Sequence, residues 1–299
     1  MSTHAIHHVT AVTAQIGRNR EFYTQVLGLR LVKRSVNQDD VSAYHLFYAD
    51  AVGSPGTDVT FFDWPAIGPN TPGAGTIALT SFRIPVGSVD FWEERLGQAE
   101  TSPERSDSNI LFSDPEGQRL ELVGDDGPGV GVPWTAAVPE ENAIRGIFGV
   151  DLASARPDAT RRILTEILGY QGSDDVFVTT STDSHARVRM VPSVSGRFGQ
   201  VGAGGVHHVA FRVTDDAELL SMQDRIEKIG LKTSGYVDRF YFHSLYFREP
   251  GGVLFELATD GPGFASDEDQ AHLGERLALP PFLESQRSRI EAGLKPLPV

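Results

Sequence analysis

The 299-residue chain contains no cysteine. Disulfide bonds, thiolate metal ligands and a cysteine nucleophile are therefore excluded, and any metal must be bound through nitrogen and oxygen. The sequence also lacks an apolar run that approaches the ~20 residues of a membrane-spanning helix. Its first residues do not combine a basic segment with an apolar core, as a secretory signal would. We therefore expect a cytoplasmic protein with no membrane partner.

Positive charge is also scarce, because 26 Lys and Arg residues stand against 40 Asp and Glu residues, for a net charge of −14. Phosphate binding needs clustered basic side chains, so nucleic acids and anionic membranes are unsuitable partners. A hydrophobic content of 40%, with 31 glycines and 18 prolines, is typical of a globular, turn-rich protein. The length exceeds that of one ordinary domain. We expect two domains and a small-molecule ligand.

Two His-His dipeptides, each in an apolar, strand-like stretch, are the strongest chemical signal. The two copies are Ile6-His7-His8-Val9-Thr10 and Val206-His207-His208-Val209-Ala210. A third apolar stretch, Val253–Leu257, carries one carboxylate, Glu256. Two imidazoles and one carboxylate form a facial triad that leaves open positions on a divalent metal and suits non-haem Fe(II) and oxygen chemistry. If these side chains converge, the protein is a metalloenzyme.

A repeated unit runs through the chain. Four times, an amphipathic helical pattern ends in an aliphatic residue followed by glycine, which accepts the left-handed conformation after a helix. The pairs are Leu27-Gly28, Leu96-Gly97, Leu168-Gly169 and Ile229-Gly230. Each lies in a pattern of one strand, one helix and two or three further strands. The four units cover residues 4–64, 75–124, 143–192 and 204–259.

We expect the four units to form two domains of two units each. The Gly- and Pro-rich stretch 125–133 has the composition of an interdomain linker. The expected division is an N-terminal domain over residues 1–125, a linker over 126–142, a C-terminal domain over 143–264 and a tail over 265–299. Apolar residues in the tail predict an amphipathic helix that covers either the pocket or a contact within a homo-oligomer. They are Phe282, Leu283, Ile290 and Leu294.

The units carry different residues at corresponding places. Only the first and fourth units have histidine on their opening strand. Only the second and fourth units have a glutamate on their last strand, namely Glu121 and Glu256. One working site between the first and last units is therefore expected. Because adjacent strand residues point to opposite faces, one histidine of each pair binds the metal, and the residues alone do not say which. Glu121 is an internal control, expected to be structural or to pair with a nearby arginine.

The remaining histidines lack such support. A buried histidine on a strand usually satisfies a local hydrogen bond. Four of them are expected at the surface or in polar networks, namely His4, His45, His185 and His272. His243 is ambiguous, because it lies on a strand that is a candidate for the pocket.

In these segments the chain resembles the vicinal oxygen chelate superfamily, also called the glyoxalase/bleomycin-resistance/dioxygenase superfamily. Within it, the chain is most similar to the ring-cleaving dioxygenases that open hydroquinones. The resemblance covers nearly the whole chain: both His-His stretches, the run from Asp238-Arg239 to Phe264, and the tail stretch from Leu279 to Arg287. It implies an α+β fold of four βαβββ modules, paired into two domains whose curled sheets enclose a metal, with a C-terminal helical tail.

The resemblance also implies roles for the site residues. The second histidine of each pair is the usual ligand, so the implied metal ligands are His8, His208 and Glu256. The implied catalytic or substrate-contacting residues around the metal are His7, His207, Arg239 and Tyr246. Fe(II) is the implied cofactor; Mn(II) suits the same ligands, and Zn or Ni can occupy them in a recombinant preparation.

A small aromatic substrate and O2 follow as partners. Tyr246 can donate to an oxyanion, His7 or His207 can act as acid or base near neutral pH, and Arg239 can pair with a phenolate. Aromatic walls for a planar ring could come from Phe240, Tyr241, Phe242 and Phe247. Structural alternatives stay open: a bonded hydroxyl for Tyr246, a salt bridge for Arg239, and sheet packing for the aromatic residues.

Three alternatives to a hydroquinone-type enzyme remain. Catechol extradiol dioxygenases of the superfamily take their ligands from the C-terminal domain alone, whereas here the first unit supplies a histidine. A glyoxalase-like lyase or isomerase commonly uses four side chains, and the first unit offers only Asp63 as a second carboxylate. A protein that only sequesters an aromatic compound would not need an intact ligand set. The sequence therefore predicts a non-haem Fe(II)-dependent dioxygenase that opens a hydroquinone-type ring with O2.

Overall fold

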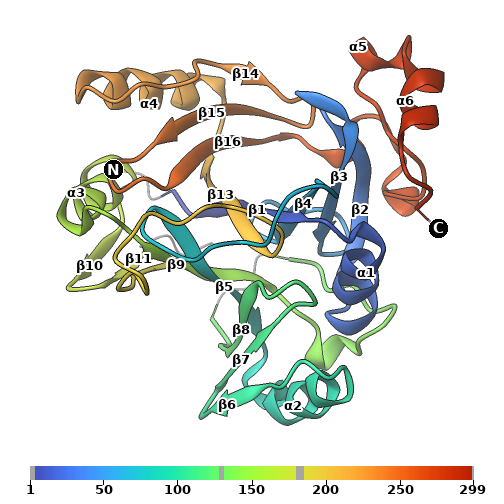
Figure 1. Ribbon diagram of the computed structural model, residues 1–299, viewed down its shortest axis with the longest axis horizontal. Helices are drawn as coiled ribbons and strands as arrows, with labels where there is room; N and C mark the ends of the chain where they lie inside the picture. The colour runs from blue at the N-terminus through green and yellow to red at the C-terminus, as the bar shows by residue number, and fades with distance from the viewer. Residues whose placement is uncertain (1–3, 128–130, 180–184, 298–299) are drawn as a thin grey trace.

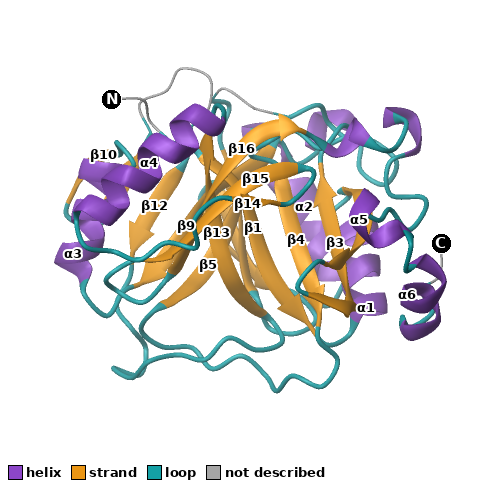
Figure 2. Ribbon diagram, turned by 90° about the horizontal axis from the view of Figure 1, so that it is seen from above, coloured by secondary structure: helices purple, strands orange, loops and turns teal. Residues whose placement is uncertain are grey.

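Four units, each of one strand, one helix and three strands, build an α+β structure (Figure 1). The computed structural model describes residues 4–127, 131–179 and 185–297, so residues 128–130 of the predicted linker lie outside the described residues. Figure 2 shows the strands gathered in the centre, with α3 (Pro157–Arg162) and α4 (Asp216–Lys228) on one flank and α1 (Ile16–Glu21) on the other. Within the described residues, no helix combines the length and apolar character needed to cross a bilayer.

The element bounds repeat the same order in every unit. In the first unit, α1 continues as a π-helical segment (Phe22–Val26), and the strands are β1 (Ile6–Thr13), β2 (Arg30–Asn37), β3 (Asp40–Ala49) and β4 (Asp58–Asp63). The second unit contains β5 (Thr76–Ile84), a 3-10 turn (Val86–Ser88), α2 (Val89–Gln98), β6 (Glu104–Ser106), β7 (Asn109–Ser113) and β8 (Arg119–Gly124). A further 3-10 turn (Glu140–Asn142) precedes the third unit.

The second half of the chain continues this order. In the third unit, α3 continues as a π-helical segment (Ile163–Ile167), and the strands are β9 (Gly146–Ala153), β10 (Gln171–Ser173), β11 (Val176–Val178) and β12 (Arg187–Met190). Around α4, the fourth unit contains β13 (Gly205–Val213), β14 (Val237–Asp238), β15 (Phe242–Arg248) and β16 (Leu254–Pro262). The tail contains 3-10 turns at Phe264–Ser266 and Gln270–His272, then α5 (Pro281–Glu284) and α6 (Arg287–Gly293).

Local sequence accounts for these elements. In α4, the Asp215 side chain accepts a hydrogen bond from the Glu218 backbone N–H, which caps the helix start. The apolar residues of this helix recur at helical spacing and are buried: Leu219, Met222 and Ile226. All eight residues of β1 are buried, because this strand lies between β4 and β13 in the middle of the sheet. Burial of both faces explains why its sequence is apolar around the two histidines.

The predicted glycine signal is confirmed at three of four helix ends. Gly28, Gly169 and Gly230 all have the left-handed conformation, with φ between 71° and 85°. Gly97 differs, because α2 continues through it to Gln98, and Glu100 takes the positive φ of 57° instead. A Cβ at Gly97 would have no atom within 4 Å, so packing does not require glycine at this position.

The pairing of units differs from the expected one. Within each unit the first strand lies parallel to the last, as in β1 with β4 and β13 with β16. Between units, however, β1 pairs antiparallel with β13 and β5 pairs antiparallel with β9. The opening strand of the first unit therefore pairs with that of the fourth, and the opening strand of the second with that of the third, whereas the expected domains group consecutive units. Adjacency in sequence favours adjacency in space, but matching strand edges and apolar faces decide the ladder.

The tail also departs from the single helix expected over 282–294. Two short helices, α5 and α6, are separated at Ser285 and Gln286; serine favours such a break because its hydroxyl competes for backbone hydrogen bonds. Leu283 and Ile290 are buried as expected, whereas Phe282 is 58% exposed. The tail packs beside β2 and β3 (Figure 1), where the Tyr44 hydroxyl donates to the Lys295 carbonyl at 2.9 Å. The four segments of the expected domain division remain a proposal.

Candidate metal centre

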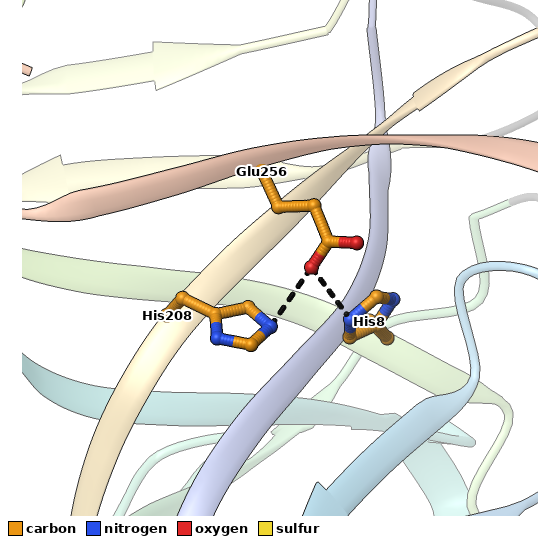
Figure 3. A group of neighbouring side chains, drawn as sticks. All are labelled: His8, His208 and Glu256. Carbon is orange, nitrogen blue, oxygen red and sulfur yellow. Dashed lines mark ion pairs between the residues drawn. The ribbon is translucent and has the colours of Figure 1, made fainter. Parts of the chain in front are cut away.

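Three buried side chains from neighbouring strands meet where the first and fourth units pair (Figure 3). They are His8 on β1, His208 on β13 and Glu256 on β16. His8 Nε2 lies 3.2 Å from Glu256 Oε2, and His208 Nε2 lies 2.9 Å from the same oxygen. One possible ligand atom from each residue lies within 4.8 Å of the other two. The two distant histidines and the late glutamate therefore converge, as the sequence predicts.

The atoms of this group are placed for a shared cation rather than for hydrogen bonds. Among the described residues, neither His208 Nε2 nor Glu256 Oε2 has a hydrogen-bond partner of suitable geometry, although the two atoms are adjacent. Buried polar atoms are seldom left in that state. Two ligand atoms bound at right angles, each ~2.1 Å from a metal, lie about 3.0 Å apart, which matches both observed distances. The residues present thus fit a divalent metal.

Electrostatics favours the ionised carboxylate. Burial alone would raise the pKa of Glu256, but the His8 and His208 imidazoles together outweigh burial and hold this pKa well below its usual value. Burial lowers the pKa of His208, which favours its neutral form. A carboxylate and a neutral imidazole are the protonation states in which these groups bind metals.

The first histidine of each pair contacts its neighbour. His7 Nδ1 lies 2.9 Å from His8 Nδ1, and His207 Nδ1 lies 2.8 Å from His208 Nδ1. A ligand whose Nε2 faces the metal carries its proton on Nδ1, so the His8 and His208 rings donate and their neighbours accept. These contacts orient the two ligand rings. Burial lowers the pKa of His207 to about 3 and that of His7 well below its usual value, so both rings are neutral at physiological pH.

Two β-bulges explain how both histidines of a pair serve one site. The β1–β13 ladder shifts register between Ile6 and His8, which skips His7. The register shifts again where Thr10 pairs with His208 and Ala11 pairs with Val206, so that His207 is skipped. Bulges re-aim side chains and are frequent beside active sites. Strict alternation, on which the one-ligand-per-pair argument rests, is therefore interrupted at the non-ligand histidine of each pair.

Glu121 provides the internal control. The prediction that it pairs with an arginine is confirmed, because Arg187 Nη2 donates to Glu121 Oε2 at 2.8 Å. The Ser81 hydroxyl donates to the same oxygen at 2.6 Å, and the Asn109 amide donates to Oε1 at 3.1 Å. A guanidinium thus neutralises Glu121, whereas Glu256 accepts from the Ser244 hydroxyl at 2.6 Å on its Oε1 and faces the His8 and His208 imidazoles with its Oε2.

The pair formed by units two and three cannot form a comparable group. Strand register places Leu79 where unit four has His208, and Gly149 where unit one has His8. A Cβ at Gly149 would lie 2.3 Å from the Arg187 carbonyl oxygen, so no side chain fits there. Within the described part of the chain, His8, His208 and Glu256 form the one group of such residues that could hold a metal.

Two residues of the triad, His8 and His208, line a pocket between the first and fourth units. The pocket is lined by His8, Thr10, His208 and Tyr246, by aromatic or imidazole rings of His45, Phe47, Phe62, Tyr241 and Phe242, and by Ser35, Val36, Asn37, Gln38, Asp39 and Arg239 at its other walls. Phe242 lies 5.2 Å from His8 between ring centroids, as expected for an aromatic wall. Phe247, expected as another wall, instead packs against Phe255 in the core. Side-chain alternation on β15 turns it away from the pocket.

Tyr246 and Arg239 form one hydrogen-bonded unit in this pocket. Arg239 Nε donates to the Tyr246 hydroxyl at 3.3 Å, and its Nη2 pairs with the Asp39 carboxylate at 2.9 Å. The Tyr246 ring lies 5.7 Å from the His208 ring. Burial raises the pKa of Tyr246 well above its usual value, so its hydroxyl stays protonated and available as a donor. Arg239 therefore forms the salt bridge and Tyr246 has the bonded hydroxyl that were considered as structural alternatives, and both residues also line the pocket.

The pocket contains residues that sequence reasoning overlooked. His45 bonds Thr60, in keeping with a polar network, yet it also lines the pocket. Alternation along 43–48 and 58–62 puts His45, Phe47, Thr60 and Phe62 on one face, and this signal becomes readable only once β3, β4 and β1 are known to be neighbours. His243 lies outside the pocket, where its Nδ1 is 2.5 Å from the Asp216 carboxylate.

Comparison with known proteins gives consistent matches. The family model described as "Glyoxalase/Bleomycin resistance protein/Dioxygenase superfamily" matches residues 5–122 and 85–257. "Putative ring-cleaving dioxygenase MhqA" of Bacillus subtilis (strain 168) is 42% identical, over 99% of this chain and 100% of the relative. "Chlorohydroquinone/hydroquinone 1,2-dioxygenase" of Sphingobium indicum is 30% identical, over 95% of this chain and 94% of the relative.

Solved structures show the same fold. A "putative dioxygenase" from Bacillus subtilis subsp. subtilis str. 168 has a TM-score of 0.91 at 40% identity, covering 100% of this chain and 98% of that one. Glyoxalase I from Zea mays has a TM-score of 0.62 at 13% identity, covering 86% of this chain and 93% of that one. The second likeness concerns the fold alone.

Proposed function

The chain belongs to the Glyoxalase/Bleomycin resistance protein/Dioxygenase superfamily, and on that premise we propose that it is a non-haem Fe(II)-dependent dioxygenase that opens a hydroquinone-type ring with O2. The observation that carries the proposal is the convergence of His8, His208 and Glu256 on one buried point. Relatives about 41% identical along nearly their whole length carry the name "putative ring-cleaving dioxygenase". The more distant relative named for hydroquinone supports the substrate class.

Internal symmetry supports a site with open metal positions. In the β1–β13 ladder, His8 pairs with Ala210 and Thr10 pairs with His208, so an approximate two-fold axis relates His8 to His208 and Thr10 to Ala210. Ala210 is level with Glu256, and Thr10 is level with Thr60. Thr60 therefore stands where symmetry would place a second carboxylate. Its hydroxyl is engaged by Thr10 and His45, at 2.8 and 2.9 Å.

The presence of Thr60 in place of a second carboxylate helps to choose among the alternative functions. A four-ligand centre of the glyoxalase type needs a fourth side chain, and Asp63, the carboxylate considered from the sequence, is not part of the triad. The catechol-type arrangement takes its ligands from C-terminal units, whereas His8 belongs to the first unit. Three ligands and an open side suit substrate and O2 together.

The protein's own groups have distinct proposed tasks. Bound Fe(II) would lower the pKa of a coordinated phenolic oxygen and give electrons a path from the ring to O2. His7 and His207 hold the ligand rings in orientation through the Nδ1 contacts. Tyr246 donates its proton in a hydrogen bond to an oxygen anion, and Arg239 provides a fixed positive charge beside it. Mn(II) fits the same ligands, and Zn or Ni could occupy them without supporting the reaction.

Oxygen uptake tests the proposal. We expect protein purified anaerobically and loaded with Fe(II) to consume one O2 per hydroquinone and to form a ring-opened product. Protein loaded with Zn should consume none, because Zn has no redox chemistry. Isomerised thiol adducts formed from glutathione and a 2-oxoaldehyde, without oxygen uptake, would instead support the glyoxalase-like alternative and contradict the proposal.

A further inference from the structure

The two-fold relation extends to the strands that flank the triad. On β15, Tyr246 is level with Glu256, and on β3, Phe47 is level with Thr60. Two residues earlier on each strand lie Ser244 and His45, which are therefore counterparts. Ser244 donates to Glu256 at 2.6 Å, and His45 Nε2 lies 2.9 Å from the Thr60 hydroxyl. Corresponding contacts between neighbouring strands thus orient the Glu256 carboxylate on one side of the site and the neutral Thr60 hydroxyl on the other, open side.

Two aromatic rings fix the position of His45. The centroid of its imidazole lies 4.0 Å from that of Phe47 and 4.5 Å from that of Phe62. The residue lines the same pocket as His8 and His208. Burial lowers its pKa well below the usual value, so the ring is neutral and carries a single N–H. Which nitrogen carries that proton decides what His45 offers to a ligand.

A chain of hydrogen bonds favours one place for this proton. Thr10 Oγ1 lies 2.8 Å from Thr60 Oγ1, which in turn contacts His45 Nε2. If Thr10 donates to Thr60 and Thr60 donates to His45, every hydroxyl proton has an acceptor. In the opposite direction, the buried Thr10 proton would have no acceptor among the described residues. The favoured direction leaves Nε2 as an acceptor and places the proton on His45 Nδ1.

The position of His45 along the sheet indicates which substrate oxygen it meets. His45 is level with Phe62, two residues or about 7 Å along β4 from Thr60. Thr60 lies on the side of the metal that has no protein ligand. His45, level with Phe62, lies two residues farther along the sheet from the triad than Thr60 does. His45 lines the same pocket as the two histidine ligands, so a ring with one oxygen on the metal can present its opposite oxygen to His45.

We propose that the His45 Nδ1–H donates a hydrogen bond to the ring oxygen that is not bound to the metal, and so selects dihydroxylated rings over monophenols. This inference rests on the proposed function, because it requires a phenolic ring at the triad. His45 is then a specificity-determining residue, and Thr60 acts through it by fixing its tautomer. Phe47 and Phe62 hold the imidazole in place.

Anaerobic binding of two probes tests the inference. Wild-type protein loaded with Fe(II) is expected to bind hydroquinone more tightly than phenol. His45→Phe keeps a flat ring between Phe47 and Phe62 but has no N–H, so hydroquinone binding should weaken about tenfold, while phenol binding and metal content stay unchanged. His45→Gln can accept from Thr60 and still donate, so it should retain most of the preference. His272→Phe, in the exposed tail, is the matched control and should behave as wild type.

The outcomes separate this inference from the function on which it rests. If wild type prefers hydroquinone and consumes O2 but His45→Phe keeps the full preference, His45 does not read the second oxygen. Equal binding of both probes by wild type also overturns the inference. Absence of oxygen uptake by the wild type overturns the proposed function itself. Should His45→Phe fail to fold, Thr60→Val decides, because loss of the fixed tautomer should reduce the preference and an unchanged preference contradicts the inference.

Discussion

Replacement of His208 by alanine is expected to abolish metal binding and turnover together. His208 Nε2 lies 2.9 Å from Glu256 Oε2, and without the imidazole a metal would keep only two of three protein ligands. Loss of residues that merely support metal ligands costs about 10–100-fold in affinity, so loss of a ligand should cost more than about 100-fold. Metal content after gel filtration, measured beside oxygen uptake, checks both parts.

Glu121→Ala is the control for this prediction. Glu121 has the same strand context as Glu256, but its charge is neutralised by Arg187, so the variant should keep full metal content. Its structural partners Ser81 and Asn109 would lose their acceptor, which affects stability rather than metal. Equal metal loss in the His208 and Glu121 variants would mean that the wrong carboxylate has been assigned to the site.

Tyr246→Phe is expected to reduce kcat by about 100-fold or more while metal content stays at the wild-type level. The variant removes only the hydroxyl, which stays protonated because burial raises the pKa of Tyr246. The ring would remain against His208, and the ion pair of Arg239 with Asp39 would still hold the pocket wall. Single-turnover oxygen uptake, compared with anaerobic binding of hydroquinone, separates a loss of catalysis from a loss of binding.

Tyr44→Phe is the matched control for this substitution. The Tyr44 hydroxyl donates to the Lys295 carbonyl at the tail, on the outer side of β3, so its loss should leave kcat unchanged. A Tyr246→Phe variant with the kcat of wild type would remove Tyr246 from the proposed proton-donating role.

The unit repeat could be predicted because it depends on local physics. Glycine after a helix and a strand before it are properties of short segments, and three of the four predicted glycines take the left-handed conformation. The metal ligands could be predicted for a related reason, because histidine and glutamate in apolar strands are costly to bury without a partner. Only one arrangement of the units brings His8 beside His208, so the chemistry itself pointed to the first and last units.

The pairing of units and the pocket walls could not be predicted in the same way. Every opening strand is largely buried on both faces, so neither its burial nor its place in the chain tells β13 to pair with β1 rather than with β9. The bulges at His7 and His207 depend on that pairing, because a bulge is a property of two strands. His45 was overlooked for the same reason, since its strand becomes a pocket wall only beside Thr60 and β1.

Location of the metal itself tests the central claim most directly. Crystals of the Fe(II)-loaded protein, measured at the iron absorption edge, should show one anomalous peak about 2.0–2.2 Å from His8 Nε2, His208 Nε2 and Glu256 Oε2, with water at the remaining positions. A peak held by a fourth side chain, or iron bound elsewhere while this triad stays without it, would contradict the account.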